Sequence, residues 1–245
     1  MKKINLIVCI AFCLLLKHVP LMGQSPYGLS WKLDAPMAGV SLGLNATSFL
    51  MERQLKPLSP AEYLNLNRQD VWAIDRSATY NWSPTAAKIS DGFLIFGILS
   101  PTLLFLDKEI RKDALTITTM GLQTIALSNG LTTLTKNLVK RARPFMYNIE
   151  VPNSYKDKKD ARLSFFSGHT SATAAMSFFT AKVYHDYHPG DRSRLWVWGG
   201  AALVPAVTGY LRWKAGKHYF TDIITGYVIG ALVGIIVPEL HKRIR

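Results

Sequence analysis

The sequence predicts an all-α fold, an integral membrane helical bundle of five to six spans with an active site at one membrane face. Three observations favour it. Hydrophobic residues make up 49% of the 245 residues, and a mean hydropathy of +0.11 is high for a soluble protein. Several apolar runs approach the ~20 residues that a helix needs to cross a bilayer. The chain also starts with a basic and then apolar segment, which is typical of a membrane-targeting leader.

Residues 1–23 form this leader. A basic start precedes an apolar run over residues 4–16, and Gly23 is a tolerable small residue before a cleavage point. We expect either a cleaved signal peptide or a retained N-terminal anchor. The only cysteines of the chain lie in this segment, so the remainder needs no disulfide and offers no cysteine ligand to a metal. They are Cys9 and Cys13.

Residues 24–90 are expected to form an extracytoplasmic N-terminal region. Residues 36–51 are apolar but short and rich in glycine, so they could be a weak span or a helix lying in the membrane interface. Residues 57–90 contain three prolines and several charges, which indicates an amphipathic or irregular connection. Ser59 and Glu62 have the spacing of a capping box and predict a helix start.

Five further apolar runs predict the spans of a domain over residues 91–241. They cover residues 92–106, 114–135, 170–184, 195–211 and 223–238. The second run contains Gln123 and Asn129, and such polar side chains would have to face neighbouring helices. Glycines four residues apart in the last run predict close helix packing. They are Gly226, Gly230 and Gly234.

Basic residues are concentrated between these runs. The chain has 29 Lys and Arg against 16 Asp and Glu, and residues 136–162 and 212–222 together supply +7 of the net charge of +13. This concentration suits an anionic substrate or an anionic lipid surface. The sequence contains no nucleic-acid recognition motif.

The densest chemistry lies in residues 212–222, which place Arg212, His218 and Asp222 at intervals of six and four. A helix from about Lys217 would put His218 and Asp222 one turn apart. The carboxylate could then hold one imidazole nitrogen and leave the other free to act as a nucleophile or base. Arg212 adds a planar set of donors for an oxyanion.

Two other stretches carry matching groups. Lys136 and Arg143 are seven residues apart, about two helical turns, so we expect both on one helix face before Pro144 ends the helix. Residues Ser167-Gly168-His169 open the next apolar run, where amide groups at a helix N-terminus can bind an anion. His169 adds a second imidazole.

Alternating spans would place all three stretches on one membrane face. Both faces carry many basic residues, so the positive-inside rule does not decide the orientation. A leader that takes residue 24 outward, followed by five spans, would put the site outside, provided that residues 36–51 do not cross. A retained first helix gives the same result with six spans.

In order and spacing, the three stretches resemble the three-part signature of the type 2 phosphatidic acid phosphatase and vanadium haloperoxidase superfamily. The resemblance covers about residues 114–240. Two positions depart from the family pattern. Phe166 stands where the family usually has Pro, and Leu211 stands where it usually has Ser, a hydroxyl that could contact the phosphate.

The resemblance implies a metal-independent phosphatase that hydrolyses lipid phosphate or diphosphate monoesters at the outer leaflet of a bacterial-type cell membrane. His218 would attack phosphorus to form a phosphohistidine, with Asp222 fixing its tautomer. His169 would protonate the departing alkoxide and then activate water. Neither a metal nor another cofactor would be needed. The residues implied to hold the phosphate oxygens are Lys136, Arg143, Ser167, Gly168 and Arg212.

Two other functions stay open at this point. A vanadate-dependent haloperoxidase would use the same cradle, because vanadate mimics the phosphorus transition state. A non-catalytic membrane protein that binds lipid phosphates is the third hypothesis. The lipid is also open among phosphatidic acid, phosphatidylglycerophosphate, polyprenyl diphosphate and lipid A phosphates, as is the oligomeric state.

Several other polar residues receive structural interpretations. His185 and His188 have a metal-like spacing but lie between later spans, away from the three stretches, so we expect no metal there. Asp75 is expected to brace the N-terminal connection, and Arg141 to be a surface anchor beside the clamp. A further cluster is expected to be solvated, with a lipid headgroup contact as the alternative. It consists of Lys156, Lys158 and Lys159.

Overall fold

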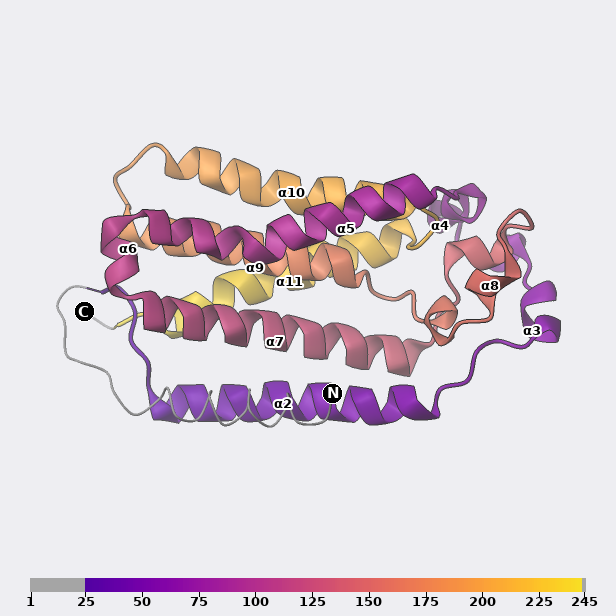
Figure 1. The fold of residues 1–245 in the computed structure, drawn as a ribbon, viewed down its shortest axis with the longest axis horizontal. Coiled ribbons are helices and arrows are strands. Elements are labelled where there is room, and N and C mark those ends of the chain that lie inside the picture. Colours follow the sequence, from indigo (N-terminus) through magenta and orange to yellow (C-terminus); the bar gives the residue numbers. More distant parts are fainter. Residues whose placement is uncertain (1–24, 244–245) are drawn as a thin grey trace.

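The computed structural model describes residues 25–243, which form an all-helical bundle (Figure 1). The predicted all-α class is confirmed, and the predictions for residues 1–23 lie outside the described residues. Long helices run side by side and make up the body of the bundle. They are α2 (Trp31–Gln54), α5 (Pro84–Leu99), α7 (Ala114–Val139), α9 (Gly168–Tyr187), α10 (Arg194–Lys214) and α11 (Phe220–Leu240).

Short helices lie at the two ends of the bundle. The end that we call the α6 end holds α6 (Lys108–Lys112), and the 3-10 helix η4 (Ser100–Leu106) leads to it from α5. The opposite end, which we call the α8 end, holds the remaining short elements (Figure 1). These are α3 (Pro60–Leu64), η2 (Arg68–Asp70), α4 (Ala73–Arg76), η3 (Ser77–Tyr80), η5 (Pro144–Tyr147), α8 (Asn153–Lys156) and η6 (Lys159–Arg162).

Local sequence signals account for several helix starts. The predicted capping box at α3 is present: Ser59 N donates to Glu62 Oε2 at 2.7 Å, and Glu62 N donates to Ser59 Oγ at 3.3 Å. Ser83 caps α5 through its side chain alone, with Ala86 N donating to its hydroxyl at 3.1 Å. All five apolar runs of the sequence fall inside helices, the first one in α5 and η4.

The helices alternate in direction, and this places the three motif stretches together. Helices α5, α9 and α11 run from the α8 end to the α6 end, whereas α7 and α10 run back (Figure 1). The segment from α7 to α9 and the turn from α10 to α11 therefore lie at the α8 end, as the sequence predicted. The described chain ends meet at the α6 end, where Gly28 N donates to the carbonyl of His241 at 2.9 Å.

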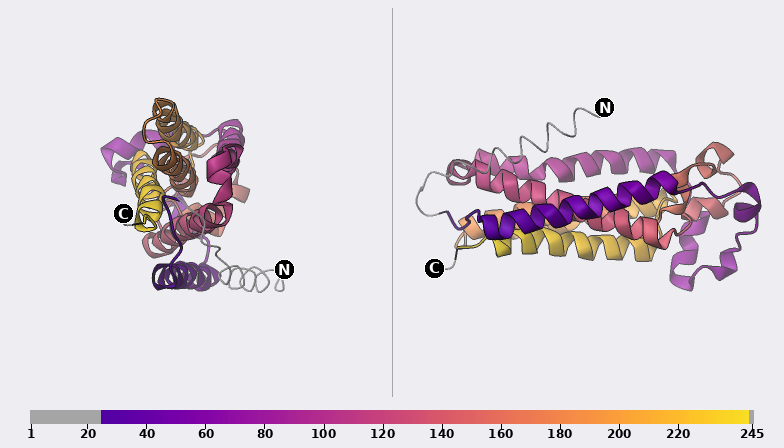
Figure 2. Two further views of the ribbon diagram at one scale, coloured as in Figure 1. Left: turned by 90° about the vertical axis from the view of Figure 1, so that its left-hand side faces the viewer. Right: turned by 90° about the horizontal axis from the view of Figure 1, so that it is seen from below.

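Residues 36–51 belong to a longer helix than the sequence indicated. Helix α2 has 24 residues, which corresponds to roughly 36 Å, and it lies lengthwise along α7 (Figures 1 and 2). Polar pairs join the two helices along their length. Gln123 donates to Asp34 at 2.7 Å and Asn129 donates to Asn45 at 2.7 Å. The prediction that Gln123 and Asn129 face a neighbouring helix is thus confirmed, and that helix is α2; Gln123 is buried there, whereas Asn129 is exposed.

This position of α2 changes the topology argument. Because α2 runs from the α6 end to the α8 end, residue 25 and the motif stretches lie at opposite ends of the bundle. If α2 crosses the membrane, a leader that places residue 24 outside would put the motif stretches inside. A cleaved leader is then incompatible with a site that faces outward. The predicted division at residue 90 also falls inside α5, so no structural boundary lies there.

Helices α9 and α11 pack closely through the predicted glycines. A Cβ atom added at Gly226 would lie 2.6 Å from the carbonyl oxygen of Ser167. One added at Gly230 or Gly234 would overlap the carbonyl of Ser171 or Ala175, respectively. These glycines therefore let the backbones of α9 and α11 approach each other, as small residues do in membrane helix pairs.

Two segments within residues 25–243 are long and apolar enough to cross a membrane, Pro84–Leu106 and Phe220–Leu240. They share the α8-to-α6 direction. The other long helices carry more polar or charged side chains. The total of five to six crossings stays a prediction.

Candidate active site

The three motif stretches meet at the α8 end. Arg143 from the first stretch donates through Nη1 to His218 Nε2 in the third at 3.1 Å. Ser167 N from the second stretch donates to the carbonyl of Asp222 at 3.0 Å. A Cβ atom at Gly168 would lie 3.6 Å from Lys136 Nζ. Each stretch therefore contacts or closely approaches the other two.

His218 lies in a tight turn between α10 and α11. Gly216 makes the turn with a φ of +68°, and a Cβ atom there would overlap the carbonyl of Asn81. Only glycine suits both conditions. Lys217 N then donates to the carbonyl of Arg212 at 3.0 Å. The predicted helix start at about Lys217 is wrong, because α11 begins at Phe220 after this turn.

Asp222 faces His218 without a regular hydrogen bond. His218 Nδ1 and Asp222 Oδ2 are 3.5 Å apart, and Nδ1 has no other partner among the described residues. The carboxylate accepts shorter bonds from Tyr219 N at 3.0 Å and from the hydroxyl of Ser164. Asp222 thus sits in the predicted place, but its closest contacts are with Ser164, Arg141 and Tyr219 rather than with the imidazole.

The contact with Arg143 fixes the tautomer of His218. A guanidinium only donates, so His218 Nε2 accepts and carries a lone pair. A neutral imidazole then bears its hydrogen on Nδ1, on the side of Asp222. Burial lowers the pKa of His218 well below its usual value, and the positive charges of Arg143, Lys136 and Arg212 lower it further. The imidazole is therefore neutral at physiological pH, and its unprotonated Nε2 suits nucleophilic attack.

Arg143 is buried but does not belong to α7. Helix α7 ends at Val139, and Lys140 adopts a left-handed conformation with a φ of +50°. The prediction that Lys136 and Arg143 share one helix face is wrong, because this reversal comes before Arg143. Both cations still act on His218, since each lowers its pKa. The chain reversal, and not a helical repeat, brings them together.

A carboxylate from the intervening loop orients Arg143. The guanidinium donates to Asp160 Oδ1 at 2.6 Å and to the backbone carbonyl of Asp160 at 2.8 Å. Burial opposes ionisation of Asp160, but Arg143 and Lys136 outweigh this effect and hold its pKa below the usual range. Asp160 is therefore ionised at neutral pH, and it fixes Arg143 from the side opposite His218.

His169 and Arg212 share a carboxylate that the motif does not include. His169 Nε2 is 2.8 Å from Asp91 Oδ1, and Arg212 Nη1 is 3.5 Å from the same oxygen. Arg212 Nε is buried and has no partner within residues 25–243. One donor of this guanidinium is thus available to an anion. Asp91 belongs to α5, and no local spacing in the sequence connects it with His169.

Ser167 serves as a helix cap in this structure. Its hydroxyl is fully buried, accepts from Thr170 N at 3.4 Å and lies 2.9 Å from the hydroxyl of Thr170. Helix α9 begins at Gly168, as the sequence predicted. The hydroxyl therefore has partners inside the protein, whereas Gly168 lies beside Lys136.

Arg141 links the site to the N-terminal region. It donates to Asp222 Oδ1 at 2.7 Å and to Asp75 Oδ2 at 2.8 Å, and it lies over the ring of Tyr219 at 3.7 Å from the centroid. Asp75 also accepts from the amide and hydroxyl of Thr221 at 2.9 and 2.6 Å. The prediction of a surface anchor is wrong for Arg141, which is held by two buried carboxylates.

The two histidines of the α6 end have separate partners. His188 Nε2 lies 3.0 Å from Asp107 Oδ2, and His185 Nδ1 accepts from Trp198 Nε1 at 3.2 Å. Within residues 25–243, no group of three or more His, Cys, Asp or Glu side chains is arranged to hold a metal ion. A metal-free site stays a prediction.

Comparison with known proteins identifies the family. The chain is 27% identical over 141 residues to a lipid A 4'-phosphatase of Porphyromonas gingivalis, a match that covers 56% of each protein. It is 26% identical over 131 residues to phospholipid phosphatase 1 of Rattus norvegicus, which covers 45% of this chain and 46% of that one. The chain thus spans about half the length of the curated relatives it matches.

A solved structure shares the fold. A transmembrane PAP2-type phosphatidylglycerolphosphate phosphatase from Bacillus subtilis superposes with a TM-score of 0.51 at 18% sequence identity, covering 84% of this chain and 98% of the other. The sequence model of the PAP2 superfamily matches residues 119–245, which include all three motif stretches. The chain therefore belongs to the PAP2 superfamily.

Proposed function

We propose that this protein is a membrane phosphatase that removes phosphate from a lipid through a phosphohistidine on His218. The observation that carries the proposal is the state of His218: it is buried, accepts from Arg143 at Nε2 and lies among three cations. Phosphoryl transfer depends on such positioning and on positive charge near the equatorial oxygens. The lipid phosphatases among its relatives support the same activity.

The first step forms a bond between Nε2 and phosphorus. The lone pair of His218 attacks while the bond from phosphorus to the leaving oxygen breaks, and protonated His169 gives its proton to that oxygen. Phosphate oxygens take over the Arg143 donor that now faces Nε2, and Lys136 and Arg212 supply the remaining charge. Asp91, at 2.8 Å from His169, would stabilise the imidazolium form that this step requires.

The second step restores the enzyme. Neutral His169 takes a proton from water, the resulting hydroxide attacks phosphorus, and the bond to Nε2 breaks. Inorganic phosphate leaves and His218 returns to its neutral form. Among the proposed phosphate-binding groups, the Ser167 hydroxyl already has a structural role as the cap of α9.

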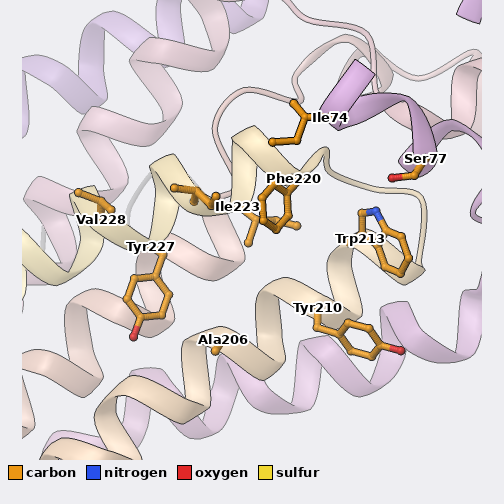
Figure 3. A pocket seen from close by; sticks show the side chains of 10 residues that line it. Ile74, Ser77, Ala206, Tyr210, Trp213, Phe220, Ile223, Tyr227 and Val228 are labelled. Atoms are coloured by element: carbon orange, nitrogen blue, oxygen red, sulfur yellow. The ribbon is translucent and has the colours of Figure 1, made fainter. Parts of the chain in front are cut away.

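An apolar surface beside the site supports a lipid substrate. Side chains of α4, η3, α10 and α11 line a groove of about 640 Å³ on the outside of the bundle (Figure 3). Trp213 and Phe220, which flank the turn carrying His218, both line it. An acyl chain could lie along this groove while its headgroup reaches the α8 end.

The catalytic proposal is tested by replacing His218. His218→Ala should abolish phosphate release from lipid phosphates in purified membranes. The wild-type protein should also yield an acid-labile phosphoenzyme that the variant lacks. His188→Ala, at the α6 end, is the matched control and should keep full activity. Activity that survives in His218→Ala would contradict the mechanism, and a screen of the four lipid phosphates would identify the substrate.

We further propose that the α8 end faces outward, so that the substrate lies in the outer leaflet. In this orientation the α6 end is cytoplasmic and contributes basic residues to that side, although the α8 end carries even more, so the positive-inside rule alone does not decide between the two orientations. The basic residues of the α6 end are Lys108, Arg111, Lys112, Arg192, Arg194, Lys242 and Arg243. Helix α2 then crosses from the cytoplasm, which requires that no cleaved leader exports residue 24.

Cysteine labelling tests the orientation directly. Replacing Cys9 and Cys13 with serine leaves a chain without cysteine. A new cysteine at Glu150 reports the α8 end, and one at Gly190 reports the α6 end; both positions are exposed. A membrane-impermeant maleimide should label the first variant in intact cells and the second only after lysis. The reverse pattern would place the site in the cytoplasm.

A further inference from the structure

Lys217 lies next to His218 and has no role in the steps above. Its backbone is held by two residues of the proposed phosphate cradle. Lys217 N donates to the carbonyl of Arg212 at 3.0 Å, and its carbonyl accepts from Arg143 Nη1 at 3.0 Å. These bonds fix the backbone of Lys217 relative to Arg212 and Arg143, two side chains of the proposed phosphate cradle.

Three aromatic rings surround the ammonium group of Lys217. Nζ lies 4.8 Å from the ring centroid of Phe145, 5.4 Å from that of Tyr155 and 5.7 Å from that of Trp82. Such rings attract a cation and restrict its motion. Lys217 forms no ion pair with a carboxylate of residues 25–243. The rings hold this charge in place but leave it without a counter-anion.

The state of this ammonium favours an anionic ligand. Burial, and then the positive charges of Arg143 and Arg212, lower the pKa of Lys217 to about 8. An anion beside Nζ would favour the charged form of the lysine and so raise this pKa again. The half-buried position keeps part of the side chain open to such a ligand.

A second lysine approaches the same ring from the loop before α9. Lys158 Nζ lies 5.2 Å from the centroid of Tyr155, so Tyr155 contacts two ammonium groups. The neighbouring Lys159 has a different environment, because its Nζ donates to the carbonyls of Glu52 and Arg53 at the end of α2, both at 3.3 Å. Only Lys158 of this pair lies beside Lys217.

We propose that Lys217, assisted by Lys158, binds a second phosphate group of the substrate beside the one that His218 attacks. The inference rests on the proposed function and narrows its substrate class. The substrate would be a lipid diphosphate, or a lipid that carries a phosphodiester close to its terminal phosphate. A lipid with a single phosphate has no group to place against Lys217.

Charge balance explains why a second phosphate needs this lysine. The attacked phosphate would contact Lys136, Arg143 and Arg212. Arg143 already pairs with Asp160, and Arg212 with Asp91, so part of this positive charge is neutralised. A second phosphate adds negative charge that only a further cation can offset. In a diphosphate the second phosphate is also the leaving group, so a cation there would stabilise the charge that develops on it.

The binding experiment uses inorganic ions and no turnover. Purified full-length His218→Ala protein is titrated with phosphate and with pyrophosphate by calorimetry. We expect pyrophosphate to bind about tenfold more tightly, the ratio that one charge-assisted hydrogen bond supplies. Adding Lys217→Met, which keeps an unbranched side chain against the rings, should reduce this ratio to near one and leave phosphate affinity within twofold. Lys217→Arg should restore the ratio.

Lys159→Met is the matched control, since it removes the same charge from the same region and should keep the tenfold ratio. A ratio that stays at tenfold in Lys217→Met would overturn the inference and leave the proposed function intact. Equal weakening of both anions would show that Lys217 acts on the cradle as a whole, which also overturns it. Failure of both anions to bind before Lys217 is changed would overturn the phosphate cradle itself.

The chemical source of the second phosphate is settled with three lipids of matched chains in the otherwise unaltered enzyme. They carry one phosphate, a diphosphate, or a phosphodiester with a terminal phosphate. Lys217→Met should reduce kcat/KM about tenfold for one of the two lipids that carry a second phosphate. For the lipid with one phosphate, kcat/KM should change less than twofold. An equal loss for all three lipids would contradict a second-phosphate site.

Discussion

Arg141 joins two carboxylates that are 147 positions apart in the chain, Asp75 at 2.8 Å and Asp222 at 2.7 Å. Asp75 lies in α4, before the part of the chain that the family signature covers. It also anchors the first turn of α11 through Thr221. The N-terminal region therefore positions the carboxylate that faces His218, and it is part of the active-site framework.

We predict that Asp75→Asn lowers kcat by about tenfold to a hundredfold, because small displacements of reacting groups cost rate on this scale. KM should change less than threefold, since Asp75 contacts no phosphate-binding side chain in the structure. Asp70→Asn is the control, because Asp70 is exposed and should leave both constants unchanged. Kinetics on membranes normalised for folded protein measure the effect. Equal kcat values in the two variants would show that the Arg141 network has no influence on catalysis.

The second prediction concerns Asp91 and proton transfer by His169. Without its charge, the imidazolium of His169 loses a partner at 2.8 Å. Asp91→Asn should reduce kcat by about tenfold, part of the 10²–10⁴-fold that general acid–base catalysis contributes. The steady-state level of phosphohistidine should shift, since His169 serves both steps, and rapid quenching in alkali, which preserves this acid-labile bond, with labelled substrate measures it.

The control for Asp91 exploits a similar pair at the other end of the bundle. Asp107→Asn removes the carboxylate that lies 3.0 Å from His188, far from the site, and should leave turnover unchanged. An Asp91→Asn enzyme with normal turnover and a normal phosphoenzyme level would rule out a positioning role for Asp91.

The sequence predicted those parts of the site that local spacing encodes. From the order of the motif residues along alternating helices, we predicted that the three stretches lie at one end of the bundle, the α8 end. The Ser167-Gly168-His169 stretch predicted the start of α9. The spacing of Lys136 and Arg143 wrongly predicted one shared helix face, because Lys140 adopts a left-handed conformation and α7 ends before Arg143. Such a turn depends on the packing of the following loop, which a periodic pattern does not contain.

Other parts of the site depend on long-range packing. Asp75 and Asp91 meet their partners only because α4 and α5 fold against α11, α9 and α10. No motif joins them in sequence. The apolar stretch at residues 36–51 did not predict that α2 extends beyond it at both ends. The polar residues of α2 find their partners on α7, which local sequence does not reveal. Tertiary contacts supply what local propensity lacks there.

The glycines of α11 give a prediction on stability. Gly230→Ala should destabilise the protein by about 1–3 kcal/mol, because the added methyl group overlaps the carbonyl of Ser171 and forces α9 and α11 apart. Gly200→Ala is the control, since a Cβ atom at this position in α10 meets nothing within 4 Å. Thermal unfolding in detergent should show a lower midpoint for the first variant and an equal or higher one for the second. Equal midpoints would contradict close packing of these helices.

Lys217 gives a prediction on pH. Its pKa of about 8 is below the usual value for lysine, so the ammonium charge is present below pH 8 and is lost as the pH rises through that value. The preference of the His218→Ala protein for pyrophosphate over phosphate should therefore fall between pH 7 and pH 9. Binding the anion favours the charged form, so the decline should begin above pH 8 at saturating pyrophosphate.

Comparison with Lys217→Arg separates this effect from the titration of pyrophosphate itself. Arginine stays charged throughout the range, so any loss of preference in that variant comes from the ligand. A steeper decline in the Lys217 protein than in Lys217→Arg is the expected result. Parallel curves would mean that Lys217 keeps its proton to pH 9 or lies outside the binding site, and unaltered pyrophosphate affinity in Lys217→Met would decide for the latter.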